Sequence, residues 1–235
     1  MNMKKTVVIH QPDFAPYIGF FHRFLHADLY LVLDHVQFVN GTSRAWTHRD
    51  KIKTPKGAQW LTLSVKKTPR DTPINRVELS KSVNWRTDHL RILEANYRNA
   101  PFYEEIIPHL RNLYNQSVSF LMEFNLLSIE MLMDLLDVRI PTMLSSEQSP
   151  QGAKNELLID LLQKAGATHY LSGVGARDYL ETHRFNDAGI KVVWQNFTHP
   201  IYPQLFGEFI PNLSSLDLLF NCGVSGARQV LRSAA

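Results

Sequence analysis

The feature that most constrains the fold is a strand–loop–helix–strand pattern within the first 34 residues. Residues 6–9 and 29–33 are short apolar runs, and such runs are typical of buried strands. Between them, apolar side chains recur at helical spacing over residues 20–25. This order and length match one βαβ unit, in which the two strands lie parallel.

The last third of the chain repeats this alternation. Ser214 and Asp217 have the spacing of a capping box, which starts a helix. Alternation at both ends of the chain predicts an α/β fold with a largely parallel, Rossmann-like sheet. The pattern predicts strands over 141–144, 169–171 and 190–194, and helices over 153–165, over 176–181 and from Ser214 onward.

The middle of the chain is predicted to be a helix-rich insertion, about 84–137, in a single α/β domain that covers residues 1–235. Pro108 is expected to kink or break the second helix of this insertion. The apolar spacing predicts helices over 84–99, 102–114 and 119–137, preceded by strands over 59–65 and 74–79.

Composition excludes several classes of protein. Hydrophobic residues make up 44% of the chain and charged residues 20%, which excludes a largely disordered protein. The net charge of +3 is too small, and the basic residues are too scattered, to predict a nucleic-acid platform. The sequence has no apolar run of membrane-spanning length. We therefore expect no membrane span, no signal peptide and a cytoplasmic location.

Metal binding through cysteines is excluded as well, because Cys222 is the only cysteine. It lies in an apolar stretch and is expected to pack as a small hydrophobic residue. His22, Arg23 and His26 lie opposite the apolar side of their predicted helix. With no third ligand placed beside the two histidines, we expect them to face solvent, and we predict no metal site.

Polar side chains follow almost every predicted strand of the sheet. In open parallel sheets, ligands bind beyond the carboxyl ends of the strands. We therefore expect a site at this edge. The residues that follow the strands are His10, Gln11, Asp13, Asp34, His35, Gln37, Ser145, Ser146, Ser172, Gly173, Gly175, Gln195, Asn196 and His199.

The turn from Ser172 to Arg177 has two interpretations. Gly173 and Gly175 let the backbone approach a ligand closely, and the free N–H groups of the next helix start, with Arg177, would hold a phosphate or carboxylate. The alternative is a tight turn with Arg177 on the surface. The glycine spacing is neither a dinucleotide fingerprint nor a P-loop.

A basic segment, residues 40–57, has little periodicity and is expected to be a functional loop or a short, irregular strand pair. Arg44, Arg49 and Lys51 lie around Trp46 in it. The segment is interpreted either as a cover over a phosphorylated substrate or as a solvated face.

Two further predictions join residues that are far apart in the sequence. Lys154 follows the 141–144 strand on the ligand side of the sheet, so it is predicted to face the same cleft as His10; the alternative is a surface lysine. The 199–221 region is predicted to meet the loop from His10 to Asp13, because neither has local partners for its polar groups. The alternative is two separate polar turns. The residues that convergence would bring to the site are His199, Tyr202, Gln204 and Asn221.

Five groups of residues form an ordered set of motifs along the chain. They are His10-Gln11-Pro12 with 16–20; 34–38; 49–53 with Trp60-Leu61; 170–173 with 178–180; and 199–204 with Leu213-Ser214 and 217–221. In this combination the chain resembles the WbqC-like family over nearly its whole length. The resemblance implies a context of surface-polysaccharide (O-antigen) gene clusters and the transfer of glycine to an amino sugar.

The first 38 residues also resemble the start of a nucleotidylyltransferase of the pantothenate-synthetase kind, a superfamily that adenylates carboxylates. The paired histidines of that superfamily are missing, since Tyr17 and Phe20 flank Ile18-Gly19 where they would stand. The terminal lysine–serine signature is missing too. This second resemblance therefore implies the fold rather than adenylation.

The first resemblance implies an enzyme that joins glycine to the amine of a nucleotide-activated amino sugar. Such a reaction needs a grip on phosphates, a base for the ammonium group and donors for a developing oxyanion. His10, assisted by Asp13 or Asp34, is the expected base. The other expected roles are donation by Gln11 or Gln195, phosphate contacts by Arg44, Arg49, Lys51 and the Gly173–Gly175 turn, and substrate contacts by Tyr17, Gln37 and Trp46.

ATP is the candidate cofactor, and it stays open whether ATP activates glycine or the acyl donor arrives preactivated. The alternative function is a non-catalytic protein of the same pathway that binds a nucleotide sugar in the same cleft. Both functions predict a small-molecule ligand. Only the enzyme predicts that His10→Ala abolishes turnover while binding stays nearly intact.

Overall fold

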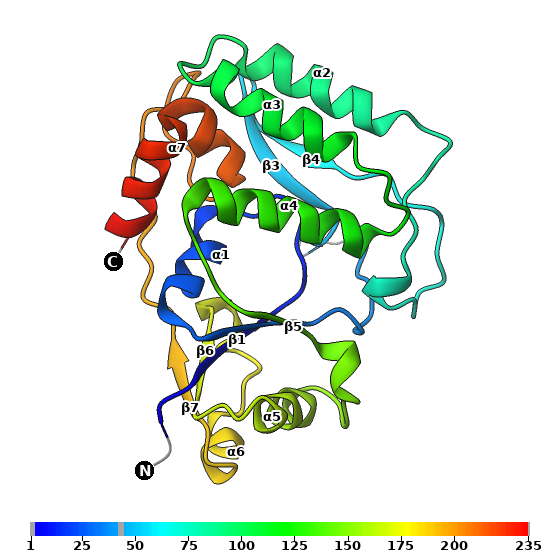
Figure 1. Cartoon of the computed structure of the whole chain (residues 1–235), viewed down its shortest axis with the longest axis vertical. Helices are drawn as coiled ribbons and strands as arrows, with labels where there is room; N and C mark the ends of the chain where they lie inside the picture. The colour runs from blue at the N-terminus through cyan, green and yellow to red at the C-terminus, as the bar shows by residue number, and fades with distance from the viewer. Residues whose placement is uncertain (1–2, 42–44, 235) are drawn as a thin grey trace.

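The structure is a computed structural model that describes residues 3–41 and 45–234, so Arg44 lies outside the described residues. Its central feature is a sheet of parallel strands in the order β5-β2-β1-β6-β7 (Figure 1). The α/β fold predicted from the sequence is thereby confirmed. The strands are β1 (Thr6–His10), β2 (Leu29–Val32), β5 (Thr142–Leu144), β6 (His169–Ser172) and β7 (Lys191–Trp194).

This strand order places β1 at the centre and reverses the direction in which the chain crosses the sheet. From β1 the chain moves outward through β2 to β5, and it then returns to place β6 and β7 on the other side of β1. The loops that leave β1 and β6 therefore run in opposite directions. In open α/β sheets such a reversal leaves a crevice at the carboxyl ends of the two strands.

Helices cover the sheet and form a separate layer beyond it (Figure 1). In that layer, which spans the predicted insertion, α2 packs on α3, α3 packs on α4, and both α3 and α4 pack on α7. The helices are α1 (Ile18–His22), α2 (Trp85–Tyr97), α3 (Tyr103–Tyr114), α4 (Leu121–Leu136), α5 (Asn155–Lys164), α6 (Thr182–Asp187) and α7 (Ser215–Ser233).

The alternation of side chains along β1 divides the apolar interior in two. Val7 and Ile9 belong to a cluster that includes Phe185 of α6 and residues of α5. Val8, between them, belongs to the larger cluster that includes Phe20 of α1 and residues of the helical layer. Successive side chains of a strand point to opposite faces of the sheet. One buried strand therefore contributes to both clusters, and His10 is the last residue of that strand.

An antiparallel hairpin of β3 (Arg49–Thr54) and β4 (Gly57–Thr62) lies beside the helical layer. The backbone N–H of Ser214 donates to the Lys51 carbonyl at 2.8 Å, and the backbone N–H of Lys53 donates to the Tyr97 hydroxyl at 2.9 Å. The hairpin is thus attached to α2 and to the start of α7. The later part of the basic segment is a regular strand rather than a loop.

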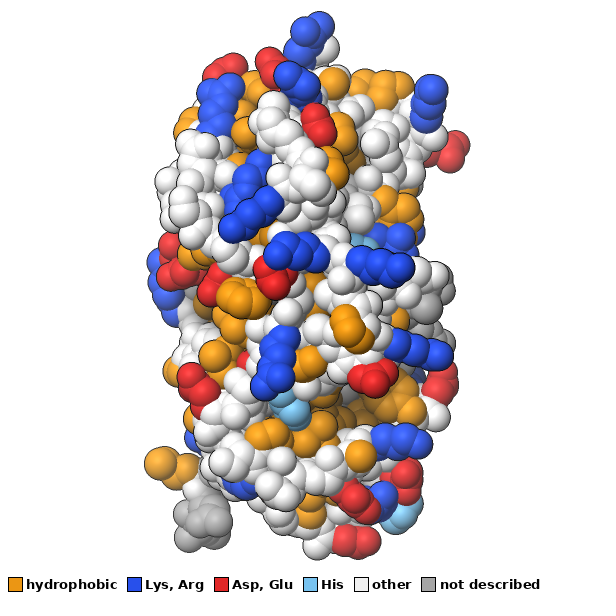
Figure 2. Space-filling view, turned by 90° about the vertical axis from the view of Figure 1, so that its right-hand side faces the viewer, with side chains coloured by type: hydrophobic (Ala, Val, Ile, Leu, Met, Phe, Trp, Pro, Cys, Tyr) orange, Lys and Arg blue, Asp and Glu red, His pale blue; other side chains and the backbone are white. Residues whose placement is uncertain are grey.

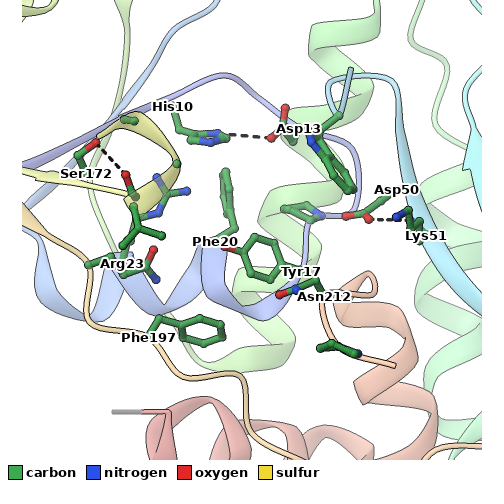
Figure 3. A pocket seen from close by; sticks show the side chains of 18 of the residues that line it. His10, Asp13, Tyr17, Phe20, Arg23, Asp50, Lys51, Ser172, Phe197 and Asn212 are labelled. Atoms are coloured by element: carbon green, nitrogen blue, oxygen red, sulfur yellow. Dashed lines mark hydrogen bonds and ion pairs between the residues drawn. The ribbon is translucent and has the colours of Figure 1, made fainter. Parts of the chain in front are cut away.

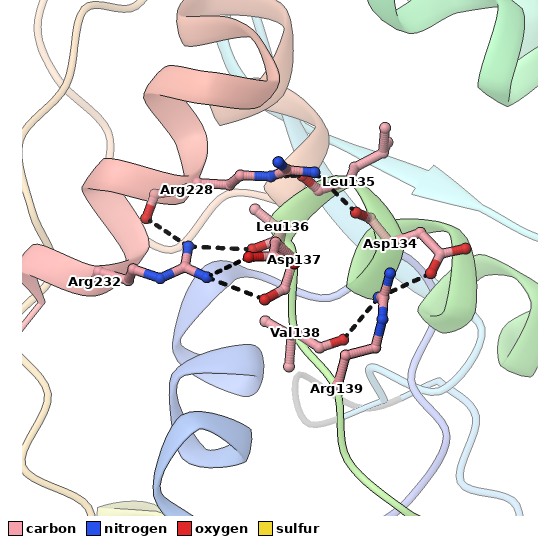
Figure 4. A network of polar contacts seen from close by, with 8 residues as sticks. All are labelled: Asp134, Leu135, Leu136, Asp137, Val138, Arg139, Arg228 and Arg232. Carbon is pink, nitrogen blue, oxygen red and sulfur yellow. Dashed lines mark hydrogen bonds and ion pairs between the residues drawn. The ribbon is translucent and has the colours of Figure 1, made fainter.

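Two arginines of α7 hold the end of α4 (Figure 4). Arg228 donates through Nε to the carbonyl of Leu135 at 2.9 Å, and Arg232 donates through Nη2 to the carbonyl and the carboxylate of Asp137 at 3.1 and 2.9 Å. The last carbonyls of a helix lack partners within the helix and carry partial negative charge. The two guanidinium groups satisfy them and fix α7 to the insertion.

The break at Pro108 and the strand over residues 74–79 were both wrongly predicted. The helix α3 runs unbroken through Pro108, and the apolar side chains around it, Ile106, Ile107 and Leu110, are all buried. Residues 74–79 do not form a strand. They begin with a 3₁₀ turn, η2 (Ile74–Arg76), in which the N–H of Val77 bonds back to the carbonyl of Ile74.

The segment after β6 also differs from the prediction. Residues 176–181 were expected to be a helix, but the chain forms a 3₁₀ turn, η4 (Val174–Ala176), and the helix α6 begins only at Thr182. Near the other end, α7 contains a break at Gly223, whose φ is +66°. A Cβ there would lie 2.5 Å from the ring of Phe102, so a side chain has no room at this position.

On the face of the molecule drawn in Figure 2, basic and acidic side chains are interspersed. The charge on this face is therefore spread and does not gather in one patch of a single sign. No helix within residues 3–41 and 45–234 combines the length and the apolar character that crossing a membrane requires.

Candidate functional site

The crevice between β1 and β6 contains a cavity of about 660 Å³ (Figure 3). Its walls come from elements that are far apart in the sequence: the end of β1, the first helical segment, β3, the turn after β6 and the loop before α7. Among the residues that line it are His10, Asp13, Tyr17, Arg23, Trp46, Asp50, Lys51, Ser172, Gly173, Gly175, Gln195 and Asn212.

A second cavity, of about 730 Å³, adjoins the first. Gln11 and Lys154 line only this second cavity, whereas His10, Asp13 and Trp46 line both. His10 and Asp13 therefore lie where the two cavities meet. Lys154, although exposed, lines the same cavity as His10.

His10 is held in one orientation by its surroundings. Its Nδ1 lies 3.0 Å from the Gln11 carbonyl and 3.5 Å from Oδ2 of Asp13, and its ring meets the edge of Phe20. Two oxygen acceptors beside Nδ1 place the proton of the neutral ring on that nitrogen, which leaves Nε2 as the basic atom. Burial, aided by the Arg23 charge, lowers the pKa of His10 to about 3. The imidazole is therefore neutral at physiological pH, although 34% of its side chain is open to the cleft.

Asp13 has the opposite shift. Burial raises its pKa from 3.8 to about 7, against the lowering effect of the Arg23 charge. A group that titrates near neutral pH is best suited to accept and return a proton. Of the two, Asp13 is therefore better suited than His10 to the role of base, which the sequence assigned to His10 with Asp13 as its assistant.

Helical spacing placed Arg23 opposite the apolar side of its helix, but Arg23 does not face solvent. Only 5% of the residue is exposed, it lines the first cavity, and its Nε has no hydrogen-bond partner in the described part of the chain. Every residue of α1, from Ile18 to His22, is buried, so this helix is enclosed on all sides. Arg23, which follows it as the first residue of a 3₁₀ segment, η1 (Arg23–His26), therefore reaches the cavity and not solvent.

His22 was wrongly expected to be exposed. It is buried, and its Nδ1 lies 3.3 Å from Nε2 of Gln195, which also donates to the Gly19 carbonyl at 2.8 Å. His26 is exposed as expected, with its Nε2 3.4 Å from that of His22. In residues 3–41 and 45–234, no group of three or more His, Cys, Asp or Glu side chains is arranged to hold a metal ion.

Asp50 is a cavity residue that the sequence analysis did not single out. Only 4% of it is exposed, and it accepts a hydrogen bond from the backbone N–H of Lys51 at 2.6 Å. Burial, with a contribution from the charge of Asp13, raises its pKa well above the ordinary value. Asp50 sits on β3, and the cavity that it faces exists only once the hairpin has packed against the rest of the chain.

Aromatic rings and cations form one wall of the cleft. The rings of Trp46 and Trp60 lie 5.0 Å apart, and the Lys51 ammonium lies 4.9 Å from the Trp60 ring centre. The Arg49 guanidinium lies over Trp60 at 4.2 Å, and Arg49 does not line either cavity. Such cation–π contacts hold the cations against the rings. Trp46 and Lys51 are thus the members of the predicted basic cover that reach the first cavity.

The turn after β6 contributes its backbone rather than its arginine. Ser172, Gly173 and Gly175 line the first cavity, but Arg177 lies 5.4 Å from the ring of Trp194 and lines neither cavity. A Cβ at Gly173 would lie 3.8 Å from Nη1 of Arg23. The cation beside this turn is therefore Arg23. Arg177 is exposed, as the alternative of a tight turn with a surface arginine requires.

Asp34 and Gln37 have partners outside the cleft. Asp34 accepts hydrogen bonds from the hydroxyls of Ser145 and Ser146 at 2.8 and 2.6 Å and from Asn75 at 3.1 Å. Burial alone would raise the pKa of Asp34, but these bonds outweigh it and lower the pKa. Gln37 donates to the carbonyl of Arg70 at 2.7 Å. Neither residue lines either cavity.

The polar residues near the C-terminal end form a buried centre of their own, which we call the Asp217 cluster: Asp217, Tyr97, Tyr202, Lys53, Gln204 and Asn221. Asp217 accepts from the hydroxyls of Tyr97 and Tyr202 at 2.8 and 2.9 Å. Lys53 donates to Gln204 at 3.0 Å, and Asn221 donates to the Asp217 carbonyl at 2.7 Å. None of the six residues lines either cavity.

The two ends of the chain do meet, but through residues other than those predicted. The hydroxyls of Ser214 and Ser215 each donate at 2.6 Å, to the carbonyls of Ala15 and Pro16, and Asn212 lines the first cavity. His199 lies near its own neighbour, with Nδ1 2.9 Å from the Pro200 carbonyl, and lines neither cavity.

Comparison with known proteins gives two matches. The sequence model of the WbqC-like protein family matches residues 11–229 of the chain. The uncharacterized protein Rv1507c of Mycobacterium tuberculosis (strain ATCC 25618 / H37Rv) is 33% identical over 223 residues, which cover 94% of this chain and 95% of that protein. No solved structure matches the chain significantly.

Proposed function

The chain belongs to the WbqC-like protein family, and from this premise and the cleft we propose that it is a group-transfer enzyme. In this proposal it attaches an amino acid, glycine, to the amine of a nucleotide-activated amino sugar used for surface polysaccharide (O-antigen). The glycine and polysaccharide parts of the proposal come from the resemblance noted in the sequence. The transfer chemistry comes from the cleft.

The observation that carries the proposal is the pair of adjoining cavities that share His10 and Asp13. A transfer between two bound substrates requires each to be held with its reacting atom at one place. Two cavities of about 660 and 730 Å³ are within the usual size range of ligand pockets. Their common boundary is where donor and acceptor would meet, and a proton acceptor is already there.

The first cavity is suited to the nucleotide sugar. It lies at the reversal of strand order, which is where open α/β sheets bind nucleotides. Arg23, buried and with its Nε unpartnered in the described part of the chain, offers a cation to a phosphate. Trp46 offers an aromatic face at the rim. The second cavity, with Lys154 at its edge, would hold the acyl donor.

The proposed step is attack of the acceptor nitrogen on the acyl carbon. The acceptor nitrogen enters as an ammonium group, and Asp13, with its pKa near 7, takes one of its protons and so frees the lone pair for attack. The N–C bond then forms, the bond from the acyl carbon to its leaving group breaks, and the second proton leaves with that group. Neutral His10 holds the Asp13 carboxyl and the acceptor in line. Gln11 accepts from the Thr47 hydroxyl through Oε1 at 3.0 Å, which turns its Nε2 into the available donor for the oxyanion. The step is the same whether ATP activates glycine or the acyl donor arrives preactivated.

The test has a binding arm and a turnover arm. In the binding arm, a thermal-shift screen of nucleotides and nucleotide sugars should raise the melting temperature, because a ligand of the folded state stabilises it by about 2.7 kcal/mol at 100 times its Kd. In the turnover arm, acyl transfer to the ligand found should fall in His10→Ala, because Asp13 and the acceptor lose the group that holds them in line, while binding of that ligand stays nearly intact.

The two arms separate enzyme from binding protein. If a nucleotide sugar binds but no acyl transfer is detected with glycine and ATP or with a preactivated glycine, the chain is a nucleotide-sugar-binding protein and the catalytic proposal fails. If no nucleotide or nucleotide sugar binds, the whole assignment of the first cavity fails.

A further inference from the structure

Three charged side chains with few partners are buried in the wall of the first cavity. Asp13, Asp50 and Arg23 are 9%, 4% and 5% exposed. Burial of an ionised group costs several kcal/mol unless an opposite charge and hydrogen bonds compensate it. In the described part of the chain, no lysine or arginine amine lies within ion-pair distance of either carboxylate; the sole ion-pair contact of Asp13 is with His10.

Asp50 lacks a partner for half of its carboxylate. One oxygen accepts the backbone N–H of Lys51, and the other has no hydrogen bond in the described ranges. The neighbouring Lys51 ammonium is turned to the aromatic wall, 4.9 Å from Trp60 and 5.6 Å from Trp46. Figure 3 draws Asp50 and Arg23 on opposite sides of the cavity, with Tyr17 and Phe20 between them.

We propose that Asp50 and Asp13 form a subsite for a primary ammonium group, and that its occupant is the amine of the sugar acceptor. This inference rests on the proposed function. The ammonium group donates hydrogen bonds to the free oxygens of the two carboxylates, while Arg23 binds a phosphate across the cavity. The subsite therefore selects amino sugars against sugars that carry a hydroxyl or an acetamido group at the same position.

The separation of the charges favours the amino sugar over glycine as the occupant. Arg23 and Asp50 both line the first cavity, and Figure 3 draws them on opposite sides of it. A ligand that reaches both residues must carry its positive and negative groups farther apart than a free amino acid does. A nucleotide-linked amino sugar has this property.

Ammonium binding should also release protons. In the free protein, burial raises the pKa of Asp13 to about 7 and that of Asp50 well above 3.8. A bound cation favours the ionised carboxylates, so protons leave as the ligand binds. His10, whose pKa burial lowers to about 3, is neutral near pH 7 and takes no part in this release. Affinity for the amine should therefore rise with pH through about 7, until the ligand amine itself loses its charge.

The experiment is calorimetric titration with matched pairs of probes. UDP-glucosamine and a dTDP-linked amino-dideoxyhexose are each compared with their N-acetyl forms, and glycine is titrated separately. We expect the amines to bind roughly tenfold or more tightly than their N-acetyl forms at pH 7.5, with proton release seen as a buffer-dependent enthalpy. Asp50→Asn should remove this preference and leave the N-acetyl forms within about twofold.

Control variants separate a subsite from a structural role. Asp50→Glu keeps the charge and should restore part of the preference, and Asp178→Asn, which removes an exposed carboxylate, should leave it intact. Equal binding of amines and N-acetyl forms would overturn the subsite and leave the proposed function standing. Binding of glycine that Asp50→Asn abolishes would overturn the choice of occupant. If no UDP or dTDP probe binds, the inference falls together with the proposed function.

Discussion

The molecule contains two buried polar centres that use the same kinds of residue for different ends. The Asp217 cluster surrounds its carboxylate with two tyrosine hydroxyls, and its lysine and amides bond to one another or to nearby carbonyls. The cleft group of His10, Asp13, Arg23 and Asp50 leaves hydrogen-bonding capacity open beside a cavity. Satisfied polar groups in an interior specify the fold. Unsatisfied ones beside a cavity indicate a ligand.

The largest effect that would test this comparison is on turnover. Asp13→Asn keeps the size of the side chain and removes the proton acceptor, so acyl transfer should fall by about 10²–10⁴-fold. The melting temperature should stay the same or rise, because a buried titratable group is lost. A variant that instead unfolds and keeps its activity per folded molecule would place Asp13 with the structural residues.

The matching change in the Asp217 cluster should act on stability. Asp217→Ala leaves the Tyr97 and Tyr202 hydroxyls without their acceptor and removes the negative charge near Lys53. At about 1–3 kcal/mol for each orphaned donor, the free energy of unfolding should drop by roughly 3–5 kcal/mol. Urea unfolding measures this drop, and unchanged stability would show that the cluster is not structural.

The next largest effect should be on the pH dependence of stability, which should distinguish the two centres. Burial raises the Asp13 pKa from 3.8 to about 7, so between these values the folded protein binds more protons than the unfolded chain. Stability contributed through Asp13 is therefore present below pH 4 and lost as the pH rises to about 7. The loss is at most about 4 kcal/mol.

The lowered pKa of His10 has the opposite effect on stability, which rises with pH between about 3 and 6.5. The contribution of Asp13 is therefore measured as the difference in free energy of unfolding between the wild type and Asp13→Asn at each pH in this range. If the two proteins keep a constant difference in free energy of unfolding from pH 4 to pH 7, the raised pKa of Asp13 is wrong.

The smallest effect should come from Tyr202→Phe. This change removes one hydroxyl that donates to Asp217 at 2.9 Å and keeps the ring. The free energy of unfolding should fall by about 1–2 kcal/mol, with no change in ligand affinity. A loss of nucleotide-sugar binding without a loss of stability would bring Tyr202 back to the site, where the sequence had placed it.

The sheet and its ligand edge could be predicted from the sequence because both follow from local patterns. Short apolar runs mark the strands. Ligands bind at the carboxyl ends of parallel strands, and residues at or just beyond the ends of β1 and β6, such as His10, Asp13 and Ser172, do line the cavity. The order of the strands in the sheet could not be predicted from these local patterns and is known only from the structure.

The rest of the site depends on packing that no local pattern records. Arg23 lines the cavity because α1 is enclosed on all sides, and Asp50 lines it because a distant hairpin packs there. Tyr202 and Gln204 were assigned to the site because no local pattern showed their partners. In the structure Tyr202 donates to Asp217, and Gln204 accepts from Lys53, which is 151 residues away in the sequence. A polar side chain without a local partner is a signal for either kind of centre.

The pairing of β1 on both sides has a consequence for how the cleft fluctuates. Strand β1 hydrogen-bonds to β2 and to β6, whereas β3 pairs with β4 alone. Amides of a doubly paired central strand exchange with solvent only when the whole unit unfolds, and those of a hairpin exchange through smaller openings. Asp13 therefore extends from the most protected part of the molecule, and Asp50 from a less protected one. A ligand that joins the two carboxylates should slow amide exchange in β3 far more than in β1.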